Sequence, residues 1–372
     1  PIGEYTIIYG IFIICGLLTI LHVETCEPVL NIKDVGYGNA HWSPDSRRIV
    51  YANPYETPKL LVLTLSDGRS QVASRRDLTA EGDNLRTIEW SPDGKQLAAA
   101  GSSKVIHVWD VTTGEVVKTL TGHEGEVRSL AWRPDGSEIA SLAADTTLRV
   151  WSLETGMATK VVREFPEPLR SPQPHHLAWS KDNKIWCVMI VSVAQFDPAT
   201  DRWSPLEAFS EGASIAELHT SPDRRQLLIF GGHGDLYWRG ETPAQRRLLG
   251  RLPVWEYSAA GWMPDNRHVA CHGSMFDVTD GKCTGRLIPW LQGGYWLCAG
   301  AGGHFRGGAV QPADVDPAKI EATLHGAIAY VAIHDDGSQR MYSVSEFREK
   351  FGWQNDPARA KWLEPAIPDA KP

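Results

Sequence analysis

The sequence predicts an all-β fold, because one pattern of two apolar strands joined by a tight turn recurs along most of the chain. The turns are rich in Pro, Asp, Asn and Gly, which adopt the backbone angles of tight turns at little cost. The residue in front of each turn recurs at intervals of 48, 42, 47, 41 and 42 residues. These anchor positions are Trp42, Trp90, Trp132, Trp179, Thr220 and Trp262.

Each repeat also carries a third and a fourth short strand. Third strands such as VIHVWDV and TLRVWSL follow the paired strands, and Thr-Gly or Asp-Gly turns at 113–114, 155–156 and 280–281 lead into a fourth. A weaker seventh copy of the pattern covers residues 295–307. Seven four-stranded antiparallel sheets, each too small to bury a core alone, predict a seven-bladed β-propeller over residues 28–337.

An uncharged segment precedes the repeats. Residues 5–23, YTIIYGIFIICGLLTILHV, contain no Asp, Glu, Lys or Arg and show no polar face. A helix of this length, at about 1.5 Å per residue, just crosses a hydrocarbon core of about 30 Å. We therefore expect a hydrophobic helix that makes residues 1–27 a membrane anchor, with a signal-like segment as the weaker alternative because no basic region precedes it. The propeller would then lie on the extracytoplasmic side.

The segment after the repeats predicts a short helical tail at 338–372. Ser343 and Glu346 have the spacing of a capping box, in which each side chain bonds the other residue's backbone N–H. Before them, residues 313–326 predict a short helical insertion, and residues 327–337 predict a strand that runs into a turn.

Charge and cysteine spacing argue against several classes of function. The chain carries a net charge of −8 and no clustered basic face, which is unfavourable for binding nucleic acid. Its six cysteines form no CxxC pair and no metal-ligand spacing. We expect no metal and no cofactor.

Two motifs refine the reading of the repeats. Gly122–His123 precede the first strand of the third copy, Trp151 closes its third strand, and Trp109–Asp110 form a Trp-Asp pair in the second copy. With these motifs the chain resembles the WD-repeat (WD40) family over roughly residues 29–335. Its ending, from GGHFRG to SEFREKFGWQNDP, is similar to that of bacterial membrane-associated WD-repeat proteins, and this resemblance implies an upstream kinase domain in some members.

The resemblance also implies a structural tetrad in the third copy. In WD-type repeats the tryptophan, serine, histidine and aspartate bond in series, which corresponds here to Trp151, Ser141, His123 and Asp145. The last three are also the residue types of a catalytic triad. Ser141, however, lies inside the strand EIASLA and no G-x-S-x-G motif surrounds it, so we expect a structural role and no catalytic residue.

The leading functional hypothesis is a non-catalytic scaffold that binds a partner protein or peptide at the loops before the first strands. Aligning the repeats on the third copy predicts a set of residues around that face. They are Asn84, Arg86, Glu126, Arg128, Gln173, His175, Ser214, Trp255, Glu256 and Tyr295. Two alternatives stay open: a TolB-like periplasmic assembly or transport factor, and a quinone-dependent oxidoreductase, which shares Trp-rich blades and D-x-x-T-G turns.

Overall fold

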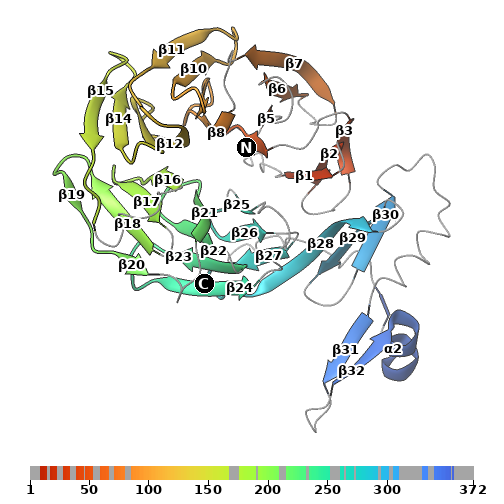
Figure 1. Ribbon diagram of the computed structural model, residues 1–372. Coiled ribbons are helices and arrows are strands. Elements are labelled where there is room, and N and C mark those ends of the chain that lie inside the picture. The colour runs from red at the N-terminus through yellow and green to blue at the C-terminus, as the bar shows by residue number, and fades with distance from the viewer. Residues whose placement is uncertain are drawn as a thin grey trace, which may run out of the picture. The chain divides into compact units, whose positions relative to one another are not determined.

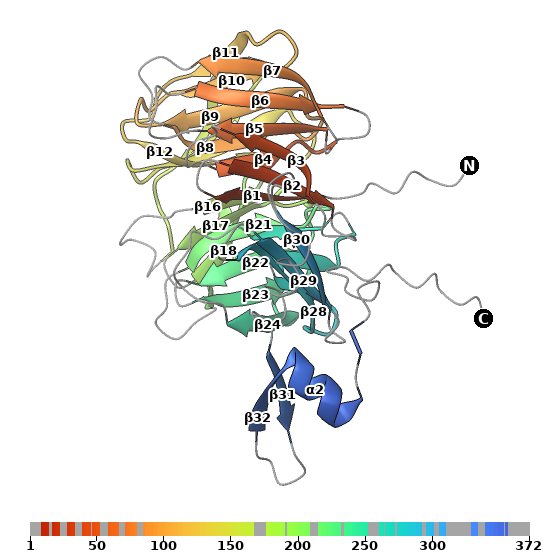
Figure 2. The ribbon, with the colours of Figure 1, turned by 90° about the vertical axis from the view of Figure 1, so that its right-hand side faces the viewer.

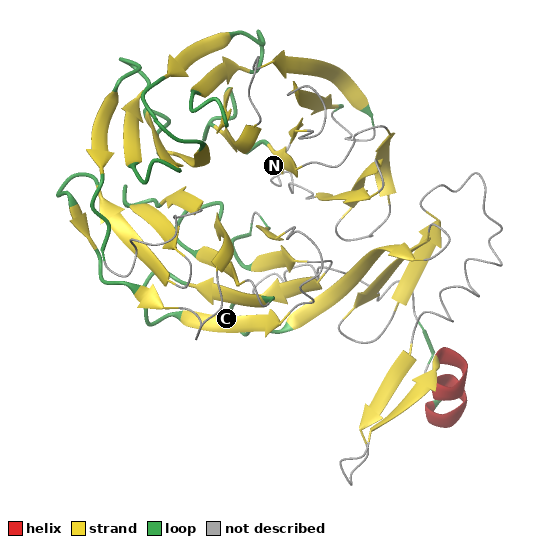
Figure 3. Ribbon diagram, in the orientation of Figure 1, coloured by secondary structure: helices red, strands yellow, loops and turns green. Residues whose placement is uncertain are grey.

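The structure is a computed structural model of the 372-residue chain, and it describes most of the repeats. The described residues are 9–14, 17–22, 28–33, 39–45, 47–52, 59–66, 71–79, 85–166, 176–189, 192–208, 215–231, 234–251, 260–263, 265–271, 274–291, 295–300, 305–309, 329–333, 339–352 and 354–355. Strands make up nearly all of their regular structure (Figure 3). The chain divides into two compact units, a larger one of residues 13–18 and 32–267 and a smaller one of residues 1–12, 19–31 and 268–372.

The larger unit contains five antiparallel sheets that follow one another along the chain (Figures 1 and 2). Each sheet begins with a strand that ends at an anchor position, and each strand pairs with the next one in sequence. Sheet 1 consists of β4 (Asn39–Trp42), β5 (Arg48–Ala52), β6 (Lys59–Leu65) and β7 (Val72–Thr79). Sheet 2 consists of β8 (Leu85–Trp90), β9 (Gln96–Gly101), β10 (Ile106–Asp110) and β11 (Val116–Leu120). Sheet 3 consists of β12 (Val127–Trp132), β13 (Glu138–Ala143), β14 (Leu148–Ser152) and β15 (Ala158–Val162).

Sheets 4 and 5 complete this series. Sheet 4 consists of β16 (His176–Trp179), β17 (Ile185–Met189), β18 (Ser192–Asp197) and β19 (Arg202–Trp203), with β20 (Glu207–Ala208) also paired to β18. Sheet 5 consists of β21 (Ile215–Thr220), β22 (Leu227–Gly231), β23 (Asp235–Arg239) and β24 (Arg246–Arg251). The four-stranded antiparallel repeat that the sequence predicts is confirmed.

The core lies between consecutive sheets. Each hydrophobic cluster joins the middle strands of one sheet to the first two or three strands of the next. Ile106 and Val108 of β10 in sheet 2, for example, share a cluster with Leu130 of β12 and Ile139 of β13 in sheet 3. The first strands also contact one another in order, β8 with β12, β12 with β16, and β16 with β21. Sheets that each bury both faces against their neighbours form an all-β propeller, in which no sheet is stable alone.

The anchor tryptophans also bond the first strands together. Trp90, Trp132 and Trp262 each donate the indole N–H to the backbone carbonyl just before the anchor position of the preceding sheet, at 3.1–3.2 Å. Those carbonyls belong to His41, Glu89 and His219. Trp179 is the exception, because its buried indole nitrogen has no hydrogen-bond partner.

The prediction of seven blades is wrong, because the described strands form six sheets of four or more strands. The sixth sheet has six strands in the order β25 (Ala260–Trp262), β26 (His268–Cys271), β27 (Ser274–Asp277), β28 (Cys283–Leu291), β29 (Tyr295–Gly300) and β30 (Phe305–Ala309). The seventh copy thus extends this sheet instead of starting its own. Strand β28 is nine residues long; it pairs with β27 from Cys283 to Arg286 and, on its other edge, with β29 from Gly285 to Leu291.

The prediction of a hydrophobic helix over residues 5–23 is also wrong. This segment contains β1 (Tyr9–Ile14) and β2 (Leu17–His22), which form a three-stranded sheet with β3 (Pro28–Lys33). Isoleucine, threonine and aromatic residues favour strands, and an apolar run without a polar face does not distinguish a strand from a helix. Among the described residues, the structure has no helix that is both long and apolar enough for a membrane span.

The C-terminal part of the smaller unit is a hairpin followed by a helix. Strands β31 (Ala329–Ile333) and β32 (Gln339–Ser343) pair and lead into helix α2 (Val344–Phe351). The predicted capping box is confirmed, since Ser343 and Glu346 each accept a hydrogen bond from the other's backbone N–H. Gly352, in the left-handed conformation, ends the helix. The predicted insertion at 313–326 lies outside the described residues.

Candidate functional site

Four side chains of the third repeat form one buried hydrogen-bonded series. Trp151 Nε1 donates to Ser141 Oγ over 2.7 Å, and Ser141 Oγ lies 2.7 Å from His123 Nε2. On the other side of the ring, His123 Nδ1 lies 2.8 Å from Asp145 Oδ2. Ser141 is fully buried, so a substrate has no access to its hydroxyl. The series thus satisfies buried polar groups in the middle of sheet 3.

Protonation states follow from this geometry. Burial lowers the pKa of His123, and the neighbouring Asp145 only partly offsets that effect. Burial acts to raise the pKa of Asp145, but hydrogen bonds from Glu124 N, Thr147 and His123 outweigh it and hold that pKa at about 2. A neutral imidazole with its proton on Nδ1 gives every group a partner, because Nδ1 then donates to Asp145 and Nε2 accepts from Ser141.

The series also fixes the loop in front of β12. Glu124 N donates to Asp145 Oδ2 over 2.8 Å, and Ala144 N donates to the carbonyl of Glu126 over 2.8 Å. A Cβ on Gly125 would clash with the backbone nitrogen of Asp145, so only glycine permits this close approach. The backbone of Glu126 is therefore held against the turn between β13 and β14.

Arg86, Glu126 and Arg128 lie where the first strands of sheets 2 and 3 begin. We call this end of the sheets the loop end, and the opposite end, where the Pro-Asp turns lie, the turn end. Arg86 Nε contacts Glu126 Oε1 at 2.9 Å, which joins the two sheets at the surface. Arg128 is half-buried and has no hydrogen-bond or ion-pair partner among the described residues. The structure thus brings Arg86 and Glu126 together and places Arg128 near the start of β12.

The other predicted binding residues are not placed by the structure. Tyr295 lies in β29 of the smaller unit, where only its backbone is described. The rest lie outside the described residues: Asn84, Gln173, His175, Ser214, Trp255 and Glu256.

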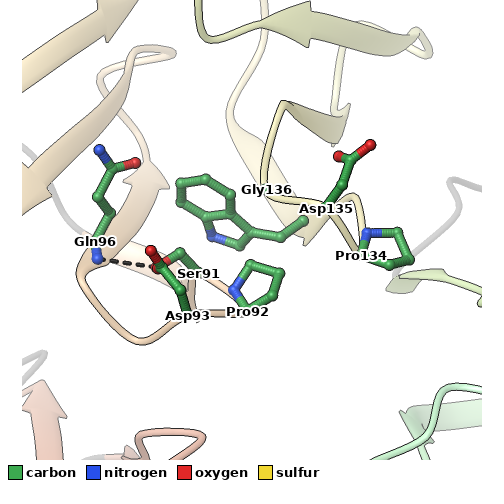
Figure 4. Close-up of a pocket in the computed structure, with 8 residues that line it drawn as sticks. Ser91, Pro92, Asp93, Gln96, Pro134, Asp135 and Gly136 are labelled. Atoms are coloured by element: carbon green, nitrogen blue, oxygen red, sulfur yellow. Dashed lines mark hydrogen bonds between the residues drawn. The ribbon is translucent and has the colours of Figure 1, made fainter.

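A pocket of about 460 Å³ lies at the turn end, between the Pro-Asp turns of sheets 2 and 3 (Figure 4). Trp132 lines it together with the two turns, which contribute Pro92, Asp93, Pro134 and Asp135. Each turn is closed by its own hydrogen bonds, as where Ser91 Oγ donates to Asp93 and accepts from the backbone of Gln96. The sequence did not predict a pocket here, because the turns were interpreted only as connections between strands. The recurring Ser-Pro-Asp pattern is the signal that these turns share one geometry.

No metal centre is found in the part of the chain that the structure describes. No group of three or more His, Cys, Asp or Glu residues there is arranged to hold an ion. His268, the described histidine of the HVACHG stretch, instead lies 4.0 Å from Asp277.

Comparison with known families decides the nature of the repeats. Residues 114–152, which contain the Trp151–Ser141–His123–Asp145 series, match the WD domain, G-beta repeat. Residues 42–126 match the anaphase-promoting complex subunit 4 WD40 domain. Residues 42–152 are WD40 repeats. Within them, Asp110 of the Trp109–Asp110 pair accepts hydrogen bonds from the backbone N–H groups of Thr112 and Thr113, and these bonds close the turn.

Curated proteins match a short part of the chain. The U5 small nuclear ribonucleoprotein 40 kDa protein of Mus musculus is 43% identical over 42 residues, which is 11% of this chain and 12% of the relative. The proteins of the same name from Homo sapiens and Bos taurus are 40% identical over the same length and shares. The match thus has about the length of one repeat of this chain and spans about an eighth of each relative.

Proposed function

We propose that this protein is a non-catalytic scaffold that binds a partner protein or peptide at the loop end of its sheets, through Arg86, Glu126 and Arg128. The WD40 propeller fold is typical of protein-interaction scaffolds. The matched family description names a complex subunit, and the curated relatives are named as ribonucleoprotein proteins, so both names refer to members of assemblies.

The observation that carries the proposal is the Glu126 carboxylate, which is paired with Arg86 on a loop whose backbone is held in place. Glu126 is presented by a loop whose backbone is bonded to the β13–β14 turn, so little conformational entropy is lost when a partner contacts it. Arg86 pairs with it, Arg128 lies two positions further along the chain in β12, and arginine is enriched at the energetic centres of interfaces. An ion pair this exposed contributes only about 0–1 kcal/mol to stability. Its charges are therefore available to a partner at little cost to the fold.

A charge swap tests this surface. In the double variant Arg86→Glu/Glu126→Arg the ion pair between sheets 2 and 3 is retained, but the charges offered to a partner are reversed. We expect proximity labelling in the cells that produce the protein to recover a defined set of partners with the unaltered chain. The swapped variant should lose that set by about tenfold or more, since each unfavourable charge contact costs several kcal/mol.

The control is Glu154→Gln, which changes an exposed charge in the turn between β14 and β15, at the turn end. It should retain the full set of partners. Equal recovery from the swapped variant and from this control would place the binding surface elsewhere. Recovery of nothing specific by any of the three proteins would refute the scaffold proposal in these cells.

The membrane-anchored, extracytoplasmic location and the upstream kinase domain stay predictions. The helix on which the anchor was based is absent among the described residues of 5–23. Cell fractionation followed by alkaline carbonate extraction tests the location directly, because an integral anchor keeps the protein in the pellet.

A further inference from the structure

Hydrogen bonds join the Pro-Asp turns of neighbouring sheets along much of the turn end. Arg133 Nε of sheet 3 donates to Asn183 Oδ1 of sheet 4 over 3.3 Å. The backbone N–H of Asp223 in sheet 5 donates to Asn266 Oδ1, in the turn after β25, over 2.9 Å. The turns of sheets 4 and 5 are joined through their backbones. Among the described residues no hydrogen bond joins the turns of sheets 2 and 3, and the pocket lies there (Figure 4).

An arginine side chain fills the corresponding space between sheets 1 and 2. Arg48 Nη2 contacts Asp45 Oδ2 of its own turn at 3.1 Å, and the guanidinium carbon lies 5.4 Å from the centre of the Trp90 ring. The same Nη2 lies against the next turn, because a Cβ on Gly94 would be only 3.3 Å from it. Arg48 thus contacts a carboxylate of one turn and the backbone of the other.

Sheets 2 and 3 repeat this arrangement without the arginine. Counting from the anchor tryptophans gives each residue an equivalent one sheet on: Asp93 for Asp45, Gln96 for Arg48, Trp132 for Trp90 and Gly136 for Gly94. All four equivalents line the pocket. The turns approach each other similarly, since a Cβ on the glycine would lie 3.5 Å from Pro44 Cδ in the first case and 3.9 Å from Pro92 Cδ in the second.

The difference lies in Gln96, which is shorter than arginine and uncharged. Its side-chain amide makes no hydrogen bond among the described residues. A Cβ on Gly136 would meet only Pro92 within 4 Å in that part of the chain, whereas the equivalent atom on Gly94 meets a guanidinium. The pocket of about 460 Å³ is therefore the space that Arg48 occupies one sheet earlier.

The walls of the pocket carry negative charge. Burial acts to raise the pKa of Asp93 and of Asp135, but hydrogen bonds within each turn outweigh it and lower both pKa values, so both carboxylates are ionised. Each Oδ2 faces a cation of its own turn, Lys95 at 3.8 Å and Arg133 at 3.3 Å. Solvent-exposed pairs of this kind exchange partners at little cost. Trp132 is only 2% exposed, so the carboxylates determine what binds.

We propose that this pocket binds an arginine side chain of a partner protein, as a second binding surface at the end opposite to Arg86 and Glu126. The guanidinium takes the place that Arg48 has between sheets 1 and 2. It donates to Asp93, as Arg48 does to Asp45, while the Gln96 amide oxygen and Asp135 supply further acceptors. Five donors in a planar fork suit acceptors on two sides of a pocket. A lysine ammonium has three donors at one point and is more strongly hydrated.

Three peptides test the ligand. Each is acetyl-Gly-Gly-X-Gly-Gly-amide, with arginine, citrulline or lysine at X, and binding is followed by saturation-transfer NMR on the peptide resonances. We expect the arginine peptide to bind with saturation strongest on its side-chain methylenes. Citrulline has nearly the same shape without the charge, so its peptide should bind at least about tenfold more weakly. The lysine peptide should bind several-fold more weakly. Binding should weaken as salt is raised from about 50 to about 500 mM.

Two variants locate the site. Gln96→Arg introduces the residue that sheet 1 accommodates at the same position, so the fold is retained while the pocket is filled, and binding should disappear. Asp93→Asn keeps an oxygen for the bonds from Ser91 Oγ and Lys95 N but removes the charge, and affinity should fall about tenfold. Asp223→Asn makes the same change in the turn of sheet 5 and is the matched control, which should bind normally.

Several results would overturn the proposal: no binding to the unaltered protein, equal binding of the citrulline or the lysine peptide, or binding retained in Gln96→Arg. Equal losses in Asp93→Asn and in the sheet 5 control would do so as well. The Arg86→Glu/Glu126→Arg protein should bind the arginine peptide normally, which distinguishes this site from the loop end.

Discussion

Single side chains in sheet 3 show how a propeller built largely of apolar strands accommodates polar groups. Ser141 has 0% exposure, and its hydroxyl serves both Trp151 and His123. Removing this hydroxyl lowers the free energy of unfolding by more than the net energy of its two hydrogen bonds. The Trp151 N–H and His123 Nε2 stay buried, and neither gains a bond to water in its place. The serine therefore determines the stability of the loop that presents Glu126.

The variant Ser141→Ala tests this role. It leaves the Trp151 N–H and His123 Nε2 without a partner, and each buried unsatisfied group costs about 1–3 kcal/mol. We expect the free energy of unfolding, from urea denaturation followed by tryptophan fluorescence, to fall by that amount or more. Ser137→Ala, which removes an exposed hydroxyl from the preceding turn, should change it by less than about 0.5 kcal/mol. Equal losses in the two variants would contradict a structural role for the series.

At the scale of strands, sheets 4 and 5 are joined by a buried ion pair. Arg239, at the end of β23, makes two hydrogen bonds to Glu207 of β20, at 2.9 and 3.2 Å. The guanidinium carbon lies 4.3 Å from the centre of the Trp186 ring, and Nη1 donates to the carbonyls of Gly240 and Glu241. This arginine follows Trp238, at the position where sheet 2 has Asp110 after Trp109. At this position Asp110 bonds the backbone of its own turn, whereas Arg239 bonds Glu207 of the neighbouring sheet.

A double-mutant cycle measures this contact. Glu207→Ala leaves a buried guanidinium without its counter-ion and should cost about 3–5 kcal/mol. Glu207→Ala/Arg239→Met should recover most of that loss, because methionine packs on Trp186 without a charge. The exposed pair Arg225–Glu241 is the control, and Glu241→Ala should cost less than about 1 kcal/mol. Stability changes that simply add in the double variant would show that the pair does not act as a unit.

At the scale of the larger unit, the anchor tryptophans bond each first strand to the one before. The exception, Trp179, is as buried as Trp132, with 2% exposure for each, but only Trp132 has a partner for its indole N–H. At Trp179, sheets 3 and 4 are therefore joined by packing without the indole hydrogen bond seen at Trp132. It lies beside the position where Arg224 reaches Trp132 from sheet 5.

We expect the same substitution, tryptophan to phenylalanine, to change the free energy of unfolding by different amounts at Trp132 and Trp179. Trp132→Phe and Trp179→Phe remove the same ring volume, so that loss largely cancels in the comparison. Trp132→Phe also removes a hydrogen bond and leaves the Glu89 carbonyl without its donor, whereas Trp179→Phe removes a donor that has no partner. We expect Trp132→Phe to be less stable than Trp179→Phe by about 1–3 kcal/mol in urea unfolding. The reverse order would mean that Trp179 has an unrecognised partner.

The repeats were predictable because their information is local. Alternating apolar residues, Ser-Pro-Asp turns and anchor tryptophans recur within a few residues of one another, and Ser343 with Glu346 specified a helix start in the same way. The errors arose where local pattern is ambiguous. Residues 5–23 are apolar throughout, so their periodicity did not distinguish a helix from β1 and β2. The pairing of the seventh copy with β28 depends on a free strand edge, which no sequence pattern shows.

The candidate sites divide in the same way. The alignment of repeats identified Arg86, Glu126 and Arg128 as residues at one end of the sheets, because equivalent positions in a repeat have equivalent places in the fold. It did not reveal that Arg86 and Glu126 form an ion pair. It also did not reveal that Arg224 donates to the Trp132 carbonyl, 92 positions away.

By itself the sequence determined the class of fold, the repeat and its turns, since these depend on side-chain alternation and on the backbone preferences of Pro, Asp and Gly. Only the tertiary structure decided that the apolar N-terminal segment pairs as strands, that the last repeat joins its neighbour's sheet, and that Arg224 of sheet 5 bonds the Trp132 carbonyl of sheet 3. Each of these depends on which edges and side chains become adjacent when sheets pack. That adjacency is set by contacts between distant residues, and no local pattern encodes it.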